Sequence, residues 1–317
     1  MKKIIVTAFL ISILTNIISV NNSFGQDKLS GQLSISGAFA LYPMAVKWSE
    51  EFRKLHPDVR IDISAGGAGK GIADALSGMV DVGMASREIY PEEINRGAFP
   101  VAVTKDAVVA VVSQQNQMLD EILKKGLKKD AGNNIWLTGK FTSWAQAFGT
   151  KSGAPIHIYT RSDACGAAEM WAKFFGKKQE DLLGVGVFGD PGLAQAVKRD
   201  PVGIGYNNLG YAYDANTRQQ VKGLRVIPLD LNNNGKIDDD ENFYNNMDEL
   251  IKAISTGKYP SPPSRDLYFV CKGNPKNNKL LTTFLKWVLT DGQKFVNVAG
   301  YIELPKEKIG AEIKKLE

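Results

Sequence analysis

The chain has 317 residues and a formal charge of only +5 at pH 7, with no long basic run. Nucleic acids and anionic membranes are therefore not expected as partners, and nothing in the composition predicts more than a monomer. The two cysteines, Cys165 and Cys271, lie far apart and do not form a disulfide framework, so two free thiols are favoured over a disulfide between them.

Residues 1–25 are typical of a secretory signal peptide. A basic start precedes a mostly apolar stretch over residues 4–20, and residues 23–25 (Ser-Phe-Gly) offer a small-x-small cleavage site. Polar interruptions argue against a membrane span, and the absence of a cysteine before Cys165 excludes a lipid-anchored N-terminal cysteine. We expect a soluble periplasmic or secreted protein that starts near Gln26. The rest of the chain exceeds a usual single core and suggests two lobes.

The first unit after this segment reads strand, tight turn, helix. Residues 33–36 are expected to form a strand that ends in the small-residue turn 37–42. Pro43 suits the first turn of a helix. An apolar face spaced for that helix follows at Met44, Trp48, Phe52 and Leu55.

The second unit repeats this order with a turn rich in glycine. A strand over residues 59–63 leads through Gly66, Gly67, Gly69 and Gly71 into a helix, whose apolar positions are Ile72, Leu76 and Met79. A short strand over 80–84 follows. Glycines between a strand and a helix let backbone N–H groups approach a ligand, and the helix N-terminus adds partial positive charge. Such a turn favours an anion, although a surface turn without a ligand is the alternative.

The later chain contains a third unit and two apolar runs. A strand over 155–159 leads to Arg161 and a further helix, and residues 202–206 form a glycine-rich strand. Residues 107–112 and 265–271 are the apolar runs, as expected of buried strands. Segment 124–134 is expected to be a solvated loop or helix end, and segment 280–299 a closing helix pair. Repeated strand–helix units predict a parallel sheet with ligands at the carboxyl ends of its strands.

Five segments together resemble the phosphate-binding proteins that serve bacterial ABC importers as solute receptors. In the family's order they are ISGAFALYPMAVKWSEEF, SAGGAGKGIADALSGMVDVGMASRE, YTRSDACGAAEMWAKFF, GDPGLAQAVKRDPVGIGY and PPSRDLYFVCKG. The resemblance implies an α/β, two-lobed periplasmic-binding-protein fold with two crossover strands and an oxyanion in the cleft between the lobes. By that analogy, the two apolar runs are the crossover strands. Lobe one would be residues 27–106 plus 265–317, and lobe two residues 107–264.

The family holds its anion with main-chain N–H groups and hydroxyls from four turns. Carried over by position, the candidate ligand-binding residues are Ala38, Phe39, Ala40, Gly67, Ala68, Gly69, Ser86, Arg87, Arg161, Asp163, Cys165, Gly166 and Ala167. Arg161 can make bidentate contacts to an oxyanion, and Arg87 would supply a second charge. Asp163 is expected to orient Arg161 rather than to touch the ligand. Backbone N–H groups of Phe39 and Ala40 would complete the shell.

This chain departs from the family where hydroxyls are usual. The first turn has alanines, the glycine turn lacks serines, and Cys165 and Ala167 stand in the third turn. Each missing hydroxyl removes a hydrogen bond worth about 0.5–1.5 kcal/mol, and more toward a charged ligand. Phosphate is the expected anion, while another oxyanion or a small organic phosphate or phosphonate stays open. Lys70 is either a cleft cation or a solvated side chain.

Residues 230–241 match a different kind of site, the twelve-residue calcium loop of EF-hand type. Its ligand positions fall at Asp230, Asn232, Asn234, Lys236 (main-chain carbonyl), Asp238 and Glu241. Gly235 stands where the loop makes its sharp turn. A solvated Asn/Asp turn is the alternative. Because residues 226–229 resemble a strand end rather than a helix, we expect a structural Ca²⁺ site in an inserted loop, not a sensor.

The expected function is therefore that of an exported solute receptor that delivers an oxyanion to the membrane subunits of an ABC importer. An enzyme is the main competitor, but no G-x-S-x-G is present, and Gly71 replaces the Ser/Thr of a nucleotide-binding phosphate loop. Cys165 at a helix start would be the candidate nucleophile, and the histidines, His56 and His157, are expected to be structural. A sensory or adhesion module that no longer transports is a third possibility.

Overall fold

The computed structural model describes residues 28–317, so the expected signal peptide lies outside the described residues. The strands of the main sheet are β1 (Gly31–Gly37), β2 (Val59–Ala65), β3 (Val82–Ala85), β4 (Ala98–Ser113), β6 (His157–Arg161), β7 (Val185–Val187), β8 (Gly203–Asn208), β9 (Leu224–Val226) and β11 (Ser264–Lys272). A separate pair consists of β5 (Leu127–Lys128) and β10 (Leu229–Asp230). Over residues 28–317, no helix combines the length and apolar character that crossing a membrane requires.

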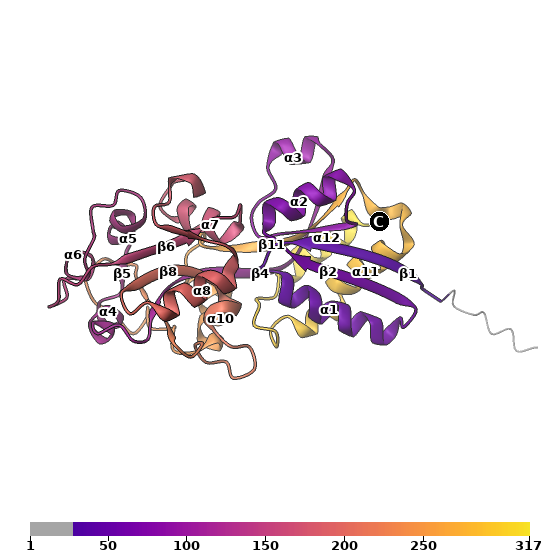
Figure 1. The fold of residues 1–317 in the computed structure, drawn as a ribbon. Helices are drawn as coiled ribbons and strands as arrows, with labels where there is room; N and C mark the ends of the chain where they lie inside the picture. The colour runs from indigo at the N-terminus through magenta and orange to yellow at the C-terminus, as the bar shows by residue number, and fades with distance from the viewer. Residues whose placement is uncertain (1–27) are drawn as a thin grey trace, which may run out of the picture.

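Helices lie on both sides of this sheet and at its ends (Figure 1). The helices are α1 (Tyr42–Leu55), α2 (Ala68–Ser77), α3 (Pro91–Asn95), α4 (Leu119–Lys125), α5 (Lys129–Trp136), α6 (Trp144–Phe148), α7 (Gly166–Phe174), α8 (Gly189–Arg199), α9 (Leu209–Ala212), α10 (Met247–Ser255), α11 (Lys279–Leu289) and α12 (Lys306–Lys315). Short 3₁₀ turns lie at Gln179–Asp181, Pro275–Asn277 and Asp291–Phe295.

The strand order is β2-β1-β3-β11-β4-β8-β6-β7, with β9 also paired to β4. β1 runs parallel to β2 and β3, and β6 runs parallel to β7 and β8. These two parallel groups are the repeated strand–turn–helix units of the sequence. The carboxyl ends of the strands in both groups are therefore followed by the turns that the sequence analysis singled out.

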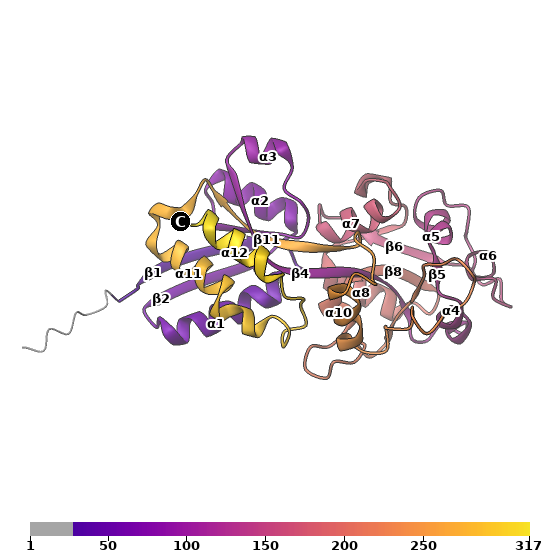
Figure 2. The same ribbon diagram turned by 180° about the vertical axis from the view of Figure 1, so that it is seen from behind.

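Two long antiparallel strands, β4 and β11, run between the two halves of the molecule (Figures 1 and 2). β4 is sixteen residues long; its first part pairs with β11, and its second part, from Val108 to Val112, pairs with β8. The apolar run at 107–112 is thus one end of a longer strand. It is buried throughout, as a strand covered on both faces must be.

The buried hydrophobic side chains form two main clusters that divide along β4. Val101 and Val103 belong to the cluster with α1 and α11, whereas the residues from Ala107 onward belong to the cluster with α7 and α10. Trp48 and Phe284 are completely buried in the first cluster, and Trp136 and Trp171 in the second. Each half therefore has a core of its own.

Several helix predictions need correction. Met79 does not lie on the apolar face of a helix: α2 ends at Ser77 because Gly78 adopts a left-handed conformation (φ +79°), and Met79 is 74% exposed. Segment 124–134 contains the end of α4 and most of α5 rather than a loop. Segment 280–299 holds α11 and a 3₁₀ turn, and α12 beyond it was not predicted.

Candidate functional site

The turns that follow the parallel strands of the two lobes meet where the lobes face each other. The amide of Gly69 in lobe one donates to the carbonyl of Ala164 in lobe two at 3.2 Å. From lobe two, the Tyr211 hydroxyl donates to the carbonyl of Phe39 at 3.1 Å. The lobes therefore touch each other across the cleft in this structure.

Glycine is required at two positions of this contact. Gly67 has φ +92°, and a Cβ placed there would lie 2.9 Å from Oδ2 of Asp163. A Cβ at Gly166 would overlap the carbonyl and hydroxyl oxygens of Ser86. A larger side chain at either position would hold the lobes apart, because its closest neighbours belong to the opposite lobe.

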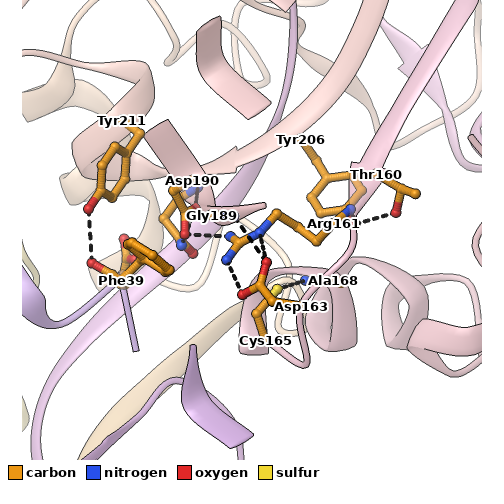
Figure 3. A network of polar contacts seen from close by, with 12 residues as sticks. Phe39, Thr160, Arg161, Asp163, Cys165, Ala168, Gly189, Asp190, Tyr206 and Tyr211 are labelled. Atoms are coloured by element: carbon orange, nitrogen blue, oxygen red, sulfur yellow. Dashed lines mark hydrogen bonds and ion pairs between the residues drawn. The ribbon is translucent and has the colours of Figure 1, made fainter. Parts of the chain in front are cut away.

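Arg161, at the end of β6, lies at the centre of a buried charge cluster (Figure 3). Its Nε and Nη2 donate to the two carboxylate oxygens of Asp163 at 2.8 and 2.6 Å, and its Nη1 donates to Oδ2 of Asp190 at 2.5 Å. The expected contact between Asp163 and Arg161 is therefore present. Because a guanidinium carries five N–H donors, two of them stay available.

The charge of Arg161 is stable despite its burial. Its side chain is only 1% exposed, and burial by itself disfavours the guanidinium. The carboxylates of Asp190 and Asp163 outweigh that penalty and hold the pKa of Arg161 above its ordinary value. The site thus offers a permanent cation whose orientation is held by two carboxylates.

Eight amides among the predicted site residues have no acceptor within residues 28–317. They belong to Phe39 and Ala40 after β1, Ala68 after β2, Ser86 and Arg87 after β3, and Asp163, Gly166 and Ala167 after β6. The amides of Ala38, Gly67 and Gly69, in contrast, donate to carbonyl oxygens. Ala68 and Gly166 are the first residues of α2 and α7, where an unpartnered N–H and the helix dipole favour an anion.

Cys165 caps α7 in the place where the family has a hydroxyl. Its Sγ accepts a hydrogen bond from the amide of Ala168 at 3.4 Å, as Figure 3 shows. Burial raises the pKa of the Cys165 thiol to about 12, although Arg161 opposes that shift. Cys165 and Cys271 are both free and buried. The Cys165 side chain therefore caps the N-terminus of α7.

Phe39 covers the Arg161 cluster from lobe one (Figure 3). Its ring centroid lies 5.5 Å from the guanidinium carbon of Arg161 and 5.7 Å from the ring of Phe188. These contacts add a cation–π interaction and an edge-to-face ring contact beside the charge cluster.

The side chains of the Ser86-Arg87 pair, which follows β3, make separate contacts in the structure. Ser86 is 2% exposed, and its carbonyl accepts from Nε of Arg265 at 3.2 Å. The Arg87 guanidinium donates to both carboxylate oxygens of Glu93 at 2.9 and 2.8 Å and stacks on Tyr90. Within residues 28–317, the hydrogen bonds and ion pairs of Arg87 go to Glu88 and Glu93 and not to the Arg161 cluster. Lys70 likewise pairs with Asp74 on its own helix.

Four residues of this region were not identified from the sequence. Asp190 at the start of α8 is ion-paired to Arg161, and Asn208 donates to Asp190 Oδ1 at 2.6 Å. Arg265 on β11 and Tyr211 in α9 make further contacts near the place where the lobes meet. Asp190 lay within a segment that resembles the family, GDPGLAQAVKRDPVGIGY, but nothing local assigned it to Arg161.

The predicted calcium loop folds around its own carboxylates. Asp230 is 2% exposed and accepts from the amides of Asn234 and Gly235 at 3.2 and 2.8 Å. Glu241, 4% exposed, accepts from the amides of Leu231 and Asn232 at 2.8 and 3.0 Å. Within residues 28–317, no three side chains of the His, Cys, Asp and Glu types are grouped so that they could hold a metal ion.

The side chains at the other ligand positions of the loop meet at Asp238. Asn232 and Asn234 donate to its Oδ2 at 3.0 and 2.5 Å, and Lys236 Nζ lies 2.5 Å from its Oδ1. Half of the six predicted ligands are thus amide or main-chain oxygens, not carboxylates. Such a mixed donor set is compatible with Ca²⁺, which takes carboxylate, amide and main-chain oxygens together.

Known proteins resemble this chain along most of its length. It is 26% identical over 302 residues to the phosphate-binding protein PstS of Staphylococcus epidermidis, covering 92% of this chain and 85% of that protein. The PstS of Staphylococcus aureus is 24% identical over 306 residues, with 94% and 86% covered.

Solved structures share the fold. A protein of Clostridium perfringens, described as a phosphate ABC transporter substrate-binding protein and solved with bound phosphate, has a TM-score of 0.69 at 23% identity, with 87% of this chain and 100% of that chain covered. An ABC-type phosphate transport receptor of Vibrio cholerae has a TM-score of 0.60 at 18% identity, with 86% and 100% covered. The model of the PBP superfamily domain matches residues 22–292. By this match and by its two-lobed α/β fold, the chain belongs to the PBP superfamily.

Proposed function

We propose that this chain is the solute-binding receptor of an ABC importer and that it binds inorganic phosphate between its lobes. The observation that supports this proposal is that the Arg161 guanidinium belongs to the same group of turns as the amides of Phe39, Ala40, Ala68, Gly166 and Ala167, which are unpartnered in the described part of the chain. Backbone N–H groups at helix N-termini and a guanidinium together bind oxyanions. The relatives named phosphate-binding proteins support this choice of ligand.

Both lobes supply part of the candidate donor set. Phe39, Ala40 and Ala68 belong to lobe one, whereas Arg161, Gly166 and Ala167 belong to lobe two. An anion held by both groups stabilises the arrangement in which the lobes touch, because only that arrangement lets all donors reach it. The membrane subunits of the importer would then recognise the closed protein.

The proposal makes this chain an exported receptor and not an enzyme. The raised pKa of Cys165 leaves almost no thiolate at neutral pH, so a nucleophilic role has no support. His157 lies at the surface beside Asp200, at 2.7 Å, far along the strand from the cleft turns. Export rests on the N-terminal sequence, residues 1–25.

Isothermal titration of the mature protein, stripped of bound ligand, tests the proposal with phosphate, sulfate and molybdate. We expect phosphate to bind at micromolar concentration or tighter and sulfate to be rejected. Heat with sulfate or molybdate alone would move the ligand to another oxyanion. The absence of heat with all three would overturn the phosphate proposal and favour a small organic phosphate or phosphonate, or a module that no longer transports.

Two matched arginine variants locate the site. Arg161→Lys keeps the charge but loses the guanidinium fork, so phosphate affinity should fall at least tenfold. Arg87→Lys makes the same change at the arginine held by Glu93 and should alter affinity less than threefold. Equal losses in both variants would show that Arg87 also belongs to the anion site.

We also propose that residues 230–241 bind one structural Ca²⁺ ion. The order of oxygen donors in the sequence and the burial of two carboxylates, Asp230 and Glu241, without a cationic partner within residues 28–317 support it. Its role would be to hold the loop in one conformation.

Thermal unfolding with and without added Ca²⁺ tests this second site. Ca²⁺ should raise the midpoint of the wild-type protein, and Asp230→Asn should abolish the shift. Asp240→Asn, a change at a loop position without a ligand role, is the matched control and should keep the shift. A midpoint that ignores Ca²⁺ in the wild-type protein, or equal shifts in both variants, would contradict the site.

A further inference from the structure

Arg265 lies at the beginning of β11, where that strand passes from lobe two to lobe one, and contacts residues of both lobes. Its Nε donates to the carbonyl of Ser86 at 3.2 Å, and its Nη2 donates to Oδ1 of Asn208. Its Nη1 lies 3.4 Å from Oδ2 of Asp106 on β4. Arg265 is therefore a buried residue, only 7% exposed, and its guanidinium lies among these three partners.

These partners connect Arg265 with both halves of the proposed anion site. Ser86 belongs to lobe one and packs directly against Gly166 of lobe two. Asn208 donates to Asp190 at 2.6 Å, and Asp190 accepts from Arg161 at 2.5 Å. A continuous path of polar contacts therefore runs from Ser86 of lobe one, through Arg265 on the crossover strand, to Arg161.

The position of Arg265 on the strand matters for lobe movement. The pairing of β11 with β4 shifts register between Leu267 and Tyr268, and Tyr268 to Val270 pair with β3 of lobe one. Arg265 lies on the other side of that irregularity, toward lobe two. A rotation of the lobes about this point would change the distance from Arg265 to the Ser86 carbonyl, because the pairing of β3 with β11 ends at Ala85 and Tyr268.

Packing and stability alone do not explain why an arginine is buried at this point of β11. Neither carboxylate oxygen of Asp106, nor Nη1 of Arg265, has a hydrogen-bond partner within residues 28–317. Two buried charges with incomplete hydrogen bonding contribute little to stability compared with apolar side chains of similar volume. The gain of this arrangement is that the guanidinium fork reaches both lobes at once.

We propose that Arg265 is a positioning residue that holds the Ser86 turn of lobe one against the Arg161 turn of lobe two. Its contact with the Ser86 carbonyl forms only when the lobes close, so it slows their opening and the release of the anion. The inference rests on the proposed function, since the anion is taken to bind between these turns.

The test uses the full mature protein and three variants. Arg265→Lys keeps the charge without the fork, and Arg265→Met removes both. Lys105→Met is the matched control: it removes a cation that lines the same hollow of about 200 Å³ as Arg265 but has no ion pair within residues 28–317. Circular dichroism of each variant verifies that it is folded.

Two readouts separate positioning from a general loss of structure. In stopped-flow experiments with inorganic phosphate, Arg265→Lys should dissociate roughly tenfold faster while the association rate changes less than threefold. Small-angle scattering should show a larger radius of gyration for phosphate-saturated Arg265→Met than for the wild-type protein. Lys105→Met should match the wild-type protein in both measurements.

The outcomes for this inference and for the proposed function differ. Wild-type dissociation rates in both Arg265 variants would overturn the positioning role while phosphate binding stands. A slower association with an unchanged dissociation rate would also overturn it, and would make Arg265 a steering charge. If the wild-type protein binds no phosphate, the proposed function fails. Small-angle scattering of the anion-free proteins then tests the positioning role by itself. Radii of gyration of the Arg265 variants equal to that of the wild-type protein would overturn this role too.

Discussion

Two arginines that follow strands, Arg87 and Arg161, differ in every respect that matters for binding. Arg161 is followed at once by a turn into α7, and its partners Asp163 and Asp190 leave it two N–H groups. Arg87 is followed by α3, where Glu93 lies six residues further on and takes up its guanidinium. The comparison teaches that the element after the strand decides which N–H groups of the arginine stay available: Glu93 of α3 takes up Arg87, whereas Arg161 keeps two donors for the proposed anion.

The largest difference between the two arginines is expected when each side chain is replaced by methionine. Arg161→Met leaves two buried carboxylates without their cation and should lower the free energy of unfolding by about 3–5 kcal/mol. Arg87→Met removes a pair nearer to solvent and should lower it by about 1 kcal/mol. Urea denaturation measures both. Equal losses would mean that the two arginines have the same structural role.

A pH series tests Asp106, a buried carboxylate that is less completely paired with its arginine than Asp163 and Asp190 are with Arg161. Burial raises the pKa of Asp106 to about 6, and Arg265 opposes that shift only in part. In the unfolded chain this carboxyl has an ordinary pKa of about 3.9. Between pH 4 and 6 the folded protein therefore keeps a proton on Asp106 that the unfolded chain has lost. As the pH rises through this range, the free energy of unfolding of the wild-type protein should fall by about 3 kcal/mol relative to Asp106→Asn, and it should stay level above pH 6.

The measurement is the free energy of unfolding of both proteins at four pH values from 4 to 7. Because the Asn variant lacks the titrating group, its curve is the reference for all other groups. A difference that stays constant across the range would show that Asp106 is ionised throughout, and would assign to Arg265 a stronger hold on it.

A glycine pair tests whether the contact between the turns is needed for binding. In Gly166→Ala the new Cβ would overlap Ser86 oxygens, so the lobes cannot close fully and phosphate affinity should fall roughly tenfold or more. Gly210→Ala adds a methyl where no atom lies within 4 Å and serves as the control. Titration calorimetry gives both affinities; an unchanged value in Gly166→Ala would place the anion elsewhere.

The smallest effect is expected from restoring the hydroxyl that the family has. Cys165→Ser replaces one cap of α7 by another, so the free energy of unfolding should change by about 1 kcal/mol or less. Phosphate affinity should stay the same or rise slightly. A large loss of affinity would indicate that the thiol has a role that a hydroxyl cannot fill.

The sequence was sufficient for the fold because the same local order recurs. Strand, tight turn and helix were recognisable after residues 33, 59 and 155 from apolar spacing and glycines, and the structure confirms the two-lobed α/β fold. The converging turns followed from that order, since parallel strands place their carboxyl ends at one edge. The prediction for Met79 used apolar spacing alone and was wrong, because α2 ends at Ser77, before Gly78.

The partners in the charge cluster were beyond local reasoning. Asp190 is 29 residues from Arg161 in the chain, and Arg265 is 179 residues from Ser86. No periodic pattern connects residues at such separations; only the closed arrangement of the lobes does. Glu93 is only six residues from Arg87, but its ion pair with Arg87 could not be predicted without the position of α3.

The place of β11 between β3 and β4 has a consequence for the order of folding. During synthesis β3 and β4 are available early, yet the strand that joins them is made from residues 264–272, after all of lobe two. The first half of the chain cannot complete its sheet until the last sixth has emerged, and its long-range pairing makes that step slow.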